Sequence, residues 1–153
     1  MSERFEPIRI EKSEVNMLLN SEAISAVWKL HRVIKLIYQK AKNVGYKVEW
    51  ERKPEEGSYA FYFKNGKDYL LYFGCWLAFA QEVGHPLCIG VRDDWVEGLK
   101  KRLIDSSPYE TIPFSDPKPH TMCCVPEEFL SENDAASKIW EWMQPIILGV
   151  SNV

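Results

Sequence analysis

In the stretch YAFYFKNGKDYLLYF, residues 59–73, two aromatic-rich runs flank the dipeptide Asn65-Gly66. Asn-Gly between two runs of β-forming residues predicts a tight β-hairpin, because both residues tolerate the positive φ angles that a two-residue turn requires. A turn centred on this dipeptide pairs Tyr62 with Tyr69 and places Phe73 on the same face. The sequence therefore predicts an aromatic surface made of Tyr62, Tyr69 and Phe73.

Upstream of the hairpin, residues 21–44 show the periodicity of a long helix that Asn20 or Ser21 can cap. Its polar face is basic and includes Lys29, Arg32 and Lys35, and these three form the basic patch considered below. The apolar residues recur at steps of three and four, and we expect them to form one buried stripe: Ala23, Val27, Leu30, Ile34, Ile37, Ala41 and Val44.

Strands and helices alternate irregularly in the rest of the chain. Alternation or short apolar runs predict strands at residues 46–53, 87–91 and 121–125, with a weak strand near 109–112. Two short helices are expected in the middle, over 75–83 and after Asp93. A last helix begins at Ser131, and Pro145 should kink or end it. This order predicts one α+β domain over residues 1–153, with a mainly antiparallel sheet of five or six strands and a partly irregular segment 1–20.

Composition limits the class of protein. A chain of 153 residues with 46% hydrophobic and 27% charged residues can bury a core without disulfides or metal. The N-terminus lacks the apolar segment of a secretory signal, and no apolar run is long enough to span a membrane. We interpret the four Cys as buried thiols of a bacterial-type cytoplasmic protein.

One catalytic hypothesis comes from the predicted strand 46–53. Glu49, Glu51 and Lys53 lie on one face of it, and a Glu-x-Lys step resembles half of the PD-(D/E)XK nuclease signature, in which carboxylates bind Mg²⁺. That signature also needs an acidic residue, usually Asp, on a preceding strand, and no Asp occurs before Asp68. The alternative is an edge strand whose charges face solvent and prevent aggregation.

A metal hypothesis rests on two His-x-x-Cys pairs, His85 with Cys88 and His120 with Cys123. Zinc accepts such ligands, but here both Cys lie in strand-like apolar runs where a thiol fills core. No nucleophile elbow and no phosphate-binding glycine loop occurs. The sequence therefore predicts no metal, no cofactor and no assigned catalytic residue.

Binding is the function that the sequence favours. The leading hypothesis is a non-enzymatic binding or protein-interaction module, with Tyr62, Tyr69 and Phe73 as its main surface and the basic patch as a second one. The partner would be another protein or a second copy. The alternatives are the nuclease above and a nucleic-acid binder that uses the basic patch. Convergence of three or more ionisable side chains in one deep pocket would instead indicate an enzyme.

A weak family resemblance accompanies these residues. The segment from Tyr59 to Trp76, continued by GHPLCIGV at residues 84–91, resembles a C-terminal accessory region of bacterial proteins that carry PD-(D/E)XK-type nuclease domains. The resemblance covers Tyr59 to Trp95 and consists of core residue types. It implies an accessory region that stands without its nuclease, and it carries no functional residue over.

Overall fold

The aromatic hairpin consists of strands β2 (Ser58–Asn65) and β3 (Asp68–Trp76), which pair in antiparallel orientation. Asn65 pairs with Asp68, so the turn residues are Gly66 and Lys67, one position later than predicted. Gly66 takes a φ of 62° at the first turn position. Glycine adopts this conformation without steric cost, so Gly66 suits the first position of the turn.

A β-bulge near the turn decides which side chains share a face. Strand β3 carries Leu70 as an extra residue, and beyond it Tyr62 pairs with Tyr72 rather than with Tyr69. The predicted strand pairing is therefore wrong. The predicted position of Phe73 beside Tyr62 is also wrong, because the shift turns Phe73 to the opposite face of the hairpin.

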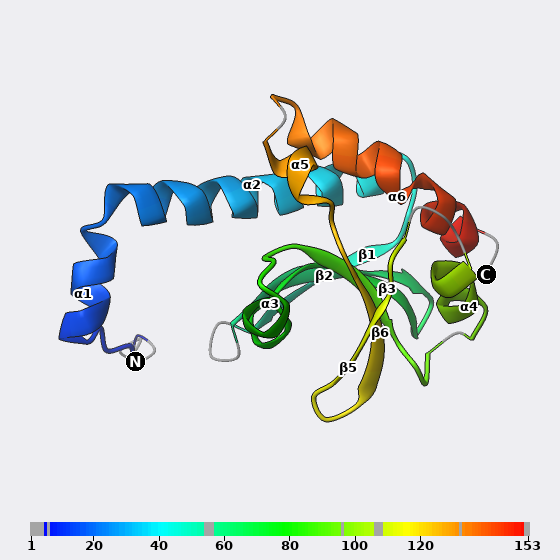
Figure 1. The fold of residues 1–153 in the computed structure, drawn as a ribbon, viewed down its shortest axis with the longest axis horizontal. Helices are drawn as coiled ribbons and strands as arrows, with labels where there is room; N and C mark the ends of the chain where they lie inside the picture. The colour runs from blue at the N-terminus through cyan, green and yellow to red at the C-terminus, as the bar shows by residue number, and fades with distance from the viewer. Residues whose placement is uncertain are drawn as a thin grey trace, which may run out of the picture. The chain divides into compact units, whose positions relative to one another are not determined.

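Four further strands complete a sheet with the order β1-β2-β3-β4-β6-β5 (Figure 1). All neighbouring strands are antiparallel. The added strands are β1 (Val48–Lys53), β4 (Cys88–Arg92), β5 (Ile112–Ser115) and β6 (Pro119–Cys124). The predicted α+β fold with an antiparallel sheet of five or six strands is confirmed.

The computed structural model describes residues 5, 7–53, 57–95, 97–105, 109–131 and 133–151, and only the backbone of residues 52, 53, 97 and 151. The chain forms two compact units, Met1–Arg32 and Val33–Val153, whose boundary lies inside helix α2 (Ser21–Asn43). The first unit contains α1 (Lys12–Leu18) and the start of α2. The Asn20 side chain caps α2, because its Oδ1 accepts the N–H groups of residues 22 and 23 at 3.1 Å.

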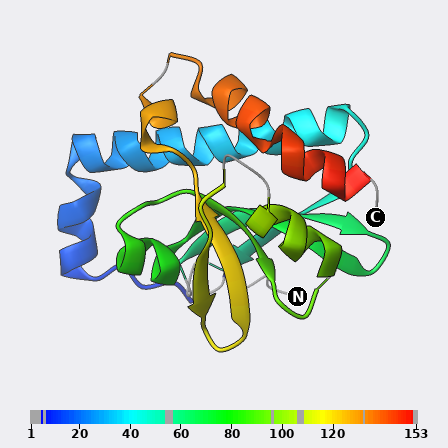
Figure 2. The same cartoon turned by 45° about the vertical axis from the view of Figure 1, so that its right-hand side comes forward.

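In the second unit, α2 from Val33 onward and α6 (Ala135–Ser151) lie on one face of the sheet (Figure 2). Tyr38 of α2 stacks on Trp50 with ring centroids 4.4 Å apart. Fewer residues of the predicted apolar stripe are buried than expected. Ile34, Ile37 and Ala41 are buried, Leu30 is half-buried, and the other members are exposed: Ala23, Val27 and Val44.

The opposite face of the sheet is only partly covered. Helix α3 (Leu77–Val83) follows β3 directly and packs Phe79 against Phe114 of β5, with ring centroids 5.2 Å apart (Figure 1). The remaining helices are α4 (Glu97–Asp105) and α5 (Glu127–Leu130). Within the described ranges, no helix has both the length and the apolar character that crossing a bilayer requires.

We expected Pro145 to kink or end the last helix, and it does not end it, because helix α6 continues through Pro145 to Ser151. A proline inside a helix removes one backbone hydrogen bond and disturbs its neighbours. The Tyr109 hydroxyl inserts at this point: it donates to the Trp142 carbonyl at 2.7 Å and accepts the Ile146 N–H at 3.3 Å. Arg102 Nε also donates to the Pro145 carbonyl at 2.8 Å. Side chains therefore satisfy backbone groups that the interrupted helix leaves available.

Tyr109→Phe is expected to lower the free energy of unfolding by about 1–3 kcal/mol, because the buried Trp142 carbonyl and Ile146 N–H both lose their hydroxyl partner. Urea denaturation followed by circular dichroism measures the effect. Tyr69→Phe, on an exposed ring, is the control and should change stability by less than about 0.5 kcal/mol. Equal stability of the two variants would contradict the role of the Tyr109 hydroxyl.

Candidate functional site

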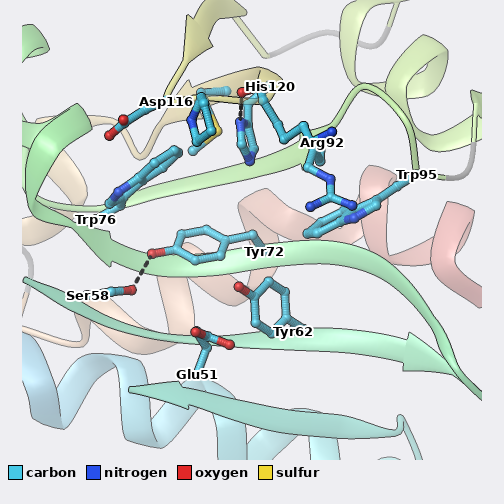
Figure 3. Close-up of a pocket in the computed structure, with 12 residues that line it drawn as sticks. Glu51, Ser58, Tyr62, Tyr72, Trp76, Arg92, Trp95, Asp116 and His120 are labelled. Atoms are coloured by element: carbon cyan, nitrogen blue, oxygen red, sulfur yellow. Dashed lines mark hydrogen bonds between the residues drawn. The ribbon is translucent and has the colours of Figure 1, made fainter. Parts of the chain in front are cut away.

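A pocket of about 200 Å³ opens on the sheet face that α2 does not cover (Figure 3). Because side chains alternate along a strand, every second residue of each strand reaches this face. Tyr62 comes from β2, Tyr72 and Trp76 come from β3, and Trp95 follows β4. The full lining consists of Glu51, Ser58, Tyr62, Tyr72, Trp76, Arg92, Trp95, Asp116, Pro117, Lys118, His120 and Met122.

Four aromatic side chains form the walls of the pocket, and they support one another. Tyr62 contacts Tyr72 and Trp95, with ring centroids 5.6 and 5.7 Å apart. Tyr72 contacts Trp76 at 6.4 Å. Outside the pocket, Tyr69 stacks on Trp95 at 5.7 Å and holds that ring in place. These contacts make a continuous aromatic surface, defined here as the aromatic wall: Tyr62, Tyr72, Trp76 and Trp95.

Gly90 has no side chain, and this leaves space for the Met122 side chain at the base of the pocket. A Cβ added there would lie 2.3 Å from the Met122 Sδ atom, so the Met122 side chain occupies the space above the glycine backbone. Met122 lines the pocket from that position. The Tyr72 hydroxyl lies 3.3 Å from Ser58 Oγ (Figure 3). This contact holds the phenol ring, which belongs to the same buried cluster as Met122.

The hydroxyl groups of the wall stay protonated at neutral pH. Burial raises the pKa of Tyr72 well above its ordinary value. Burial, the charge of Glu51 and a hydrogen bond to that carboxylate raise the pKa of Tyr62 as well. Both tyrosines are therefore hydrogen-bond donors or acceptors rather than anions.

The charged groups of the pocket balance. Glu51 and Asp116 contribute two negative charges, and Arg92 and Lys118 contribute two positive ones. Arg92 is also paired with Asp94, whose Oδ1 lies 2.5 Å from Arg92 Nε. A pocket with this balance offers little net attraction to either an anion or a cation.

His120 completes the polar lining. Its Nδ1 lies 2.7 Å from the Lys118 carbonyl, and its ring packs edge-on against Trp76 with centroids 5.0 Å apart. Burial lowers the pKa of His120, so the imidazole is neutral at pH 7. With Glu51, Arg92, Asp116 and Lys118, it brings five ionisable side chains to this pocket.

Two of the three residues of the predicted aromatic surface lie together. Tyr62 lines the pocket and contacts Tyr69, with ring centroids 4.8 Å apart, and Tyr69 stacks on Trp95 with 38% of its surface exposed. Phe73 is fully buried on the other face, against Phe61 at 5.6 Å. A buried side chain on that face cannot contact a ligand in the pocket, so we do not retain Phe73 as a binding residue.

The basic patch lies apart from this pocket in the chain. Lys29, Arg32 and Lys35 are all exposed on α2, and the Arg32 guanidinium lies 5.3 Å from the centre of the Trp28 ring. No lining residue of the pocket comes from α2. Nucleic-acid binding by the patch remains a prediction.

Two residues of the nuclease hypothesis, Glu49 and Glu51, share one face of strand β1 but have different partners. Glu49 is paired with Lys64 at 2.8 Å, whereas Glu51 lines the pocket and contacts Tyr62. The side chain of Lys53 lies outside the described residues. Among the side chains that are described, no group of three or more His, Cys, Asp or Glu could hold a metal ion.

The residues of the two His-x-x-Cys pairs lie in different places. His85 and Cys123 line a second cavity of about 490 Å³, Cys88 is buried, and His120 lines the first pocket. In the second cavity, His85 Nε2 and Trp142 Nε1 are buried and have no hydrogen-bond partner in the described part of the chain. Its charged lining residues are exposed glutamates, Glu110, Glu127 and Glu128, and it lacks a wall of stacked rings.

Sequence reasoning missed Trp76, Trp95 and Arg92 as site residues, and it considered His120 only as a metal ligand with Cys123. Alternation along a strand could have placed Trp76 with Tyr72, because they are two residues apart. No local signal places Arg92 beside His120, because their pairing joins β4 to β6 across 28 residues. Together these features define an α+β protein with an aromatic-lined pocket. Neither known family models, nor curated proteins, nor solved structures give a match to this chain.

Proposed function

We propose that the protein is a non-enzymatic binding module whose pocket accepts one neutral planar ring, free or carried by a larger partner. The observation that supports this proposal is the aromatic wall, which lines the pocket together with two negative and two positive side chains. Sites for drug-sized ligands occupy about 300–1,000 Å³, so a pocket of about 200 Å³ suits one ring rather than a whole large ligand. Stacking on tyrosine and tryptophan favours a flat ring.

The hydrogen bonds of the lining support binding over catalysis. Ser58 Oγ contacts the Tyr72 hydroxyl rather than His120, so these described residues do not form a nucleophile–base pair. Glu51 is occupied by Tyr62, and Arg92 Nε by Asp94. Polar groups that satisfy one another hold the aromatic wall in a fixed shape, as a binding site requires.

Tryptophan signals provide a direct test. The chain has six Trp, and each gives one indole N–H resonance in a ¹H–¹⁵N spectrum. Titration with nucleosides and with aromatic amino acid amides should move the signals of Trp76 and Trp95. The Trp50 and Trp142 signals should stay in place, because those rings do not line the pocket. If no compound of this panel moves the Trp76 or Trp95 signal, the proposed function is overturned.

Trp95→Ala is expected to weaken binding of a ring ligand by about tenfold or more, because stacking on one aromatic side chain contributes about 1–3 kcal/mol. Isothermal titration with the best compound of the panel measures the loss. The matched control is Trp28→Ala, an exposed tryptophan of the N-terminal unit that should leave affinity unchanged. Equal affinity of both variants would show that Trp95 does not contact the ligand.

Five ionisable side chains converge in this pocket, more than the three that we took from the sequence as the sign of an enzyme. An enzyme with His120 as its base is therefore the second candidate. The same ligand distinguishes the two functions. Recovery of the bound compound unchanged after prolonged incubation with the protein supports the binding module. A product that forms with the intact protein and not with His120→Phe would replace the binding module by an enzyme.

We further propose that the protein works in the reducing cytoplasm of a bacterium. All four cysteines are free thiols: Cys75, Cys88, Cys123 and Cys124. Burial raises the pKa of Cys88 well above its ordinary value, so this thiol is chemically inert. Only Cys88 and Cys123 are buried, whereas Cys75 and Cys124 are half-buried, so the expectation of four buried thiols is wrong for two of them. Free thiols are typical of cytoplasmic proteins.

A further inference from the structure

The orientation of His120 fixes which of its nitrogens carries the proton. A carbonyl oxygen accepts hydrogen bonds and cannot donate them, so the contact of 2.7 Å between Nδ1 and the Lys118 carbonyl requires a proton on Nδ1. In a neutral imidazole, Nε2 then carries a lone pair and is an acceptor. Figure 3 shows this second nitrogen turned toward the space above Tyr72. It has no hydrogen-bond partner among the residues described.

A donor lies directly beside this acceptor. Arg92 and His120 are opposite one another on the antiparallel strands β4 and β6, and both line the pocket. Cα atoms of such cross-strand pairs are only about 4.5–5.5 Å apart, so two side chains on the same face reach one ligand. The ion pair with Asp94 uses Arg92 Nε, and the terminal amino groups of the guanidinium make no hydrogen bond in the described part of the chain. The guanidinium carbon lies 5.7 Å from the centre of the Trp95 ring, so this group borders the aromatic wall.

This inference rests on the proposed function and names the chemical class of its ligand. We infer that the ring in the pocket is a nucleobase-like heterocycle whose edge presents an N–H donor beside an acceptor atom. The N–H donates to His120 Nε2, and the neighbouring acceptor receives a hydrogen bond from the Arg92 guanidinium. The faces of the ring lie against the aromatic wall.

Other ligand classes fit the pocket less well. The side chain of phenylalanine has no polar edge, and the indole of tryptophan has an N–H without an adjacent acceptor. Glu51 and Asp116 balance Arg92 and Lys118, so the pocket offers little net attraction to a quaternary ammonium group or to a phosphate. A neutral heterocycle with a donor–acceptor edge satisfies His120 and Arg92 without adding charge.

Methylation of the ring donor tests the inference on the unmodified protein. Two pairs of nucleosides serve as probes: uridine with 3-methyluridine, and adenosine with N6,N6-dimethyladenosine. In each pair the methyl groups remove the N–H donor and leave a planar ring. At least one parent should bind about tenfold or more tightly than its methylated partner, because the partner leaves the His120 acceptor unpaired. Titration calorimetry gives both affinities.

Each outcome of this comparison is decisive. If both members of both pairs bind with equal affinity, rings enter the pocket but the inferred donor contact is wrong. The same conclusion follows if phenylalanine amide binds as tightly as the nucleosides. If no ring compound moves the Trp76 or Trp95 signal, the proposed function fails and the inference fails with it.

Two variants of His120 separate recognition from packing. His120→Phe keeps a flat ring against Trp76 but lacks the lone pair, so it should bind the parent nucleoside and its methylated partner equally. His120→Gln retains a carbonyl acceptor and should recover part of the preference for the parent. A purely structural role of His120 would lower both affinities in parallel, and that result would overturn the inference.

Discussion

Phe73→Ala is expected to lower the free energy of unfolding by about 3–5 kcal/mol, one of the largest losses that a single side chain of this protein can cause. Phe73 is fully buried on the helix-covered face of the sheet and contacts Phe61 at 5.6 Å. Truncation removes the burial of a whole aromatic ring and leaves a cavity that the surrounding side chains fill only in part. Urea denaturation, with the same slope for both proteins, measures the loss.

Tyr69→Ala is the matched control, because Tyr69 belongs to the same strand and was predicted to share a surface with Phe73. Its ring is 38% exposed, so its removal should lower stability much less than removal of Phe73. A loss of less than about 1 kcal/mol for Phe73→Ala would mean that Phe73 is not a core residue. The predicted face with Tyr62 would then have to be reconsidered.

The hairpin illustrates what a single sequence can establish. Aromatic-rich runs around Asn65-Gly66 predict both strands, and the structure has both of them. One extra residue at Leu70 then reverses the side of every residue beyond it, because side chains alternate with a period of two. No local pattern marks that bulge. The presence of strands could therefore be predicted from composition, whereas the partners of their side chains could not.

The composition of the pocket could be predicted from the sequence only in part, for a different reason. Tyr62 was predicted as a binding residue from its own strand, but the rings and charges that complete the pocket come from segments far apart in the chain. Trp76 ends β3, Arg92 lies on β4, and His120 comes from β6. Their convergence depends on the order of strands in the sheet. Strand order follows from long-range packing, and alternation within one strand carries no information about it.

Gly74→Ala is expected to lower the free energy of unfolding by about 2–6 kcal/mol, through backbone strain and steric overlap together. Gly74 has a φ of 151° on β3, between the pocket residues Tyr72 and Trp76. An added Cβ would lie 2.4 Å from the Ala60 Cβ and 2.5 Å from the Tyr59 carbonyl oxygen. These atoms belong to the backbone of β2 or are attached to it, so they cannot rotate away, and the two central strands must separate.

Gly84→Ala distinguishes crowding from strain. Gly84 ends α3 with a φ of 74°, and nothing lies within 4 Å of a Cβ added there. That variant should lose only about 1–2 kcal/mol, the cost of a left-handed conformation for alanine. Thermal and urea unfolding of both variants measure the difference. A loss at Gly74 no larger than at Gly84 would mean that β2 and β3 do not approach as closely as the pocket requires. Because Tyr72 and Trp76 flank Gly74, a larger loss should also weaken binding of any ring ligand.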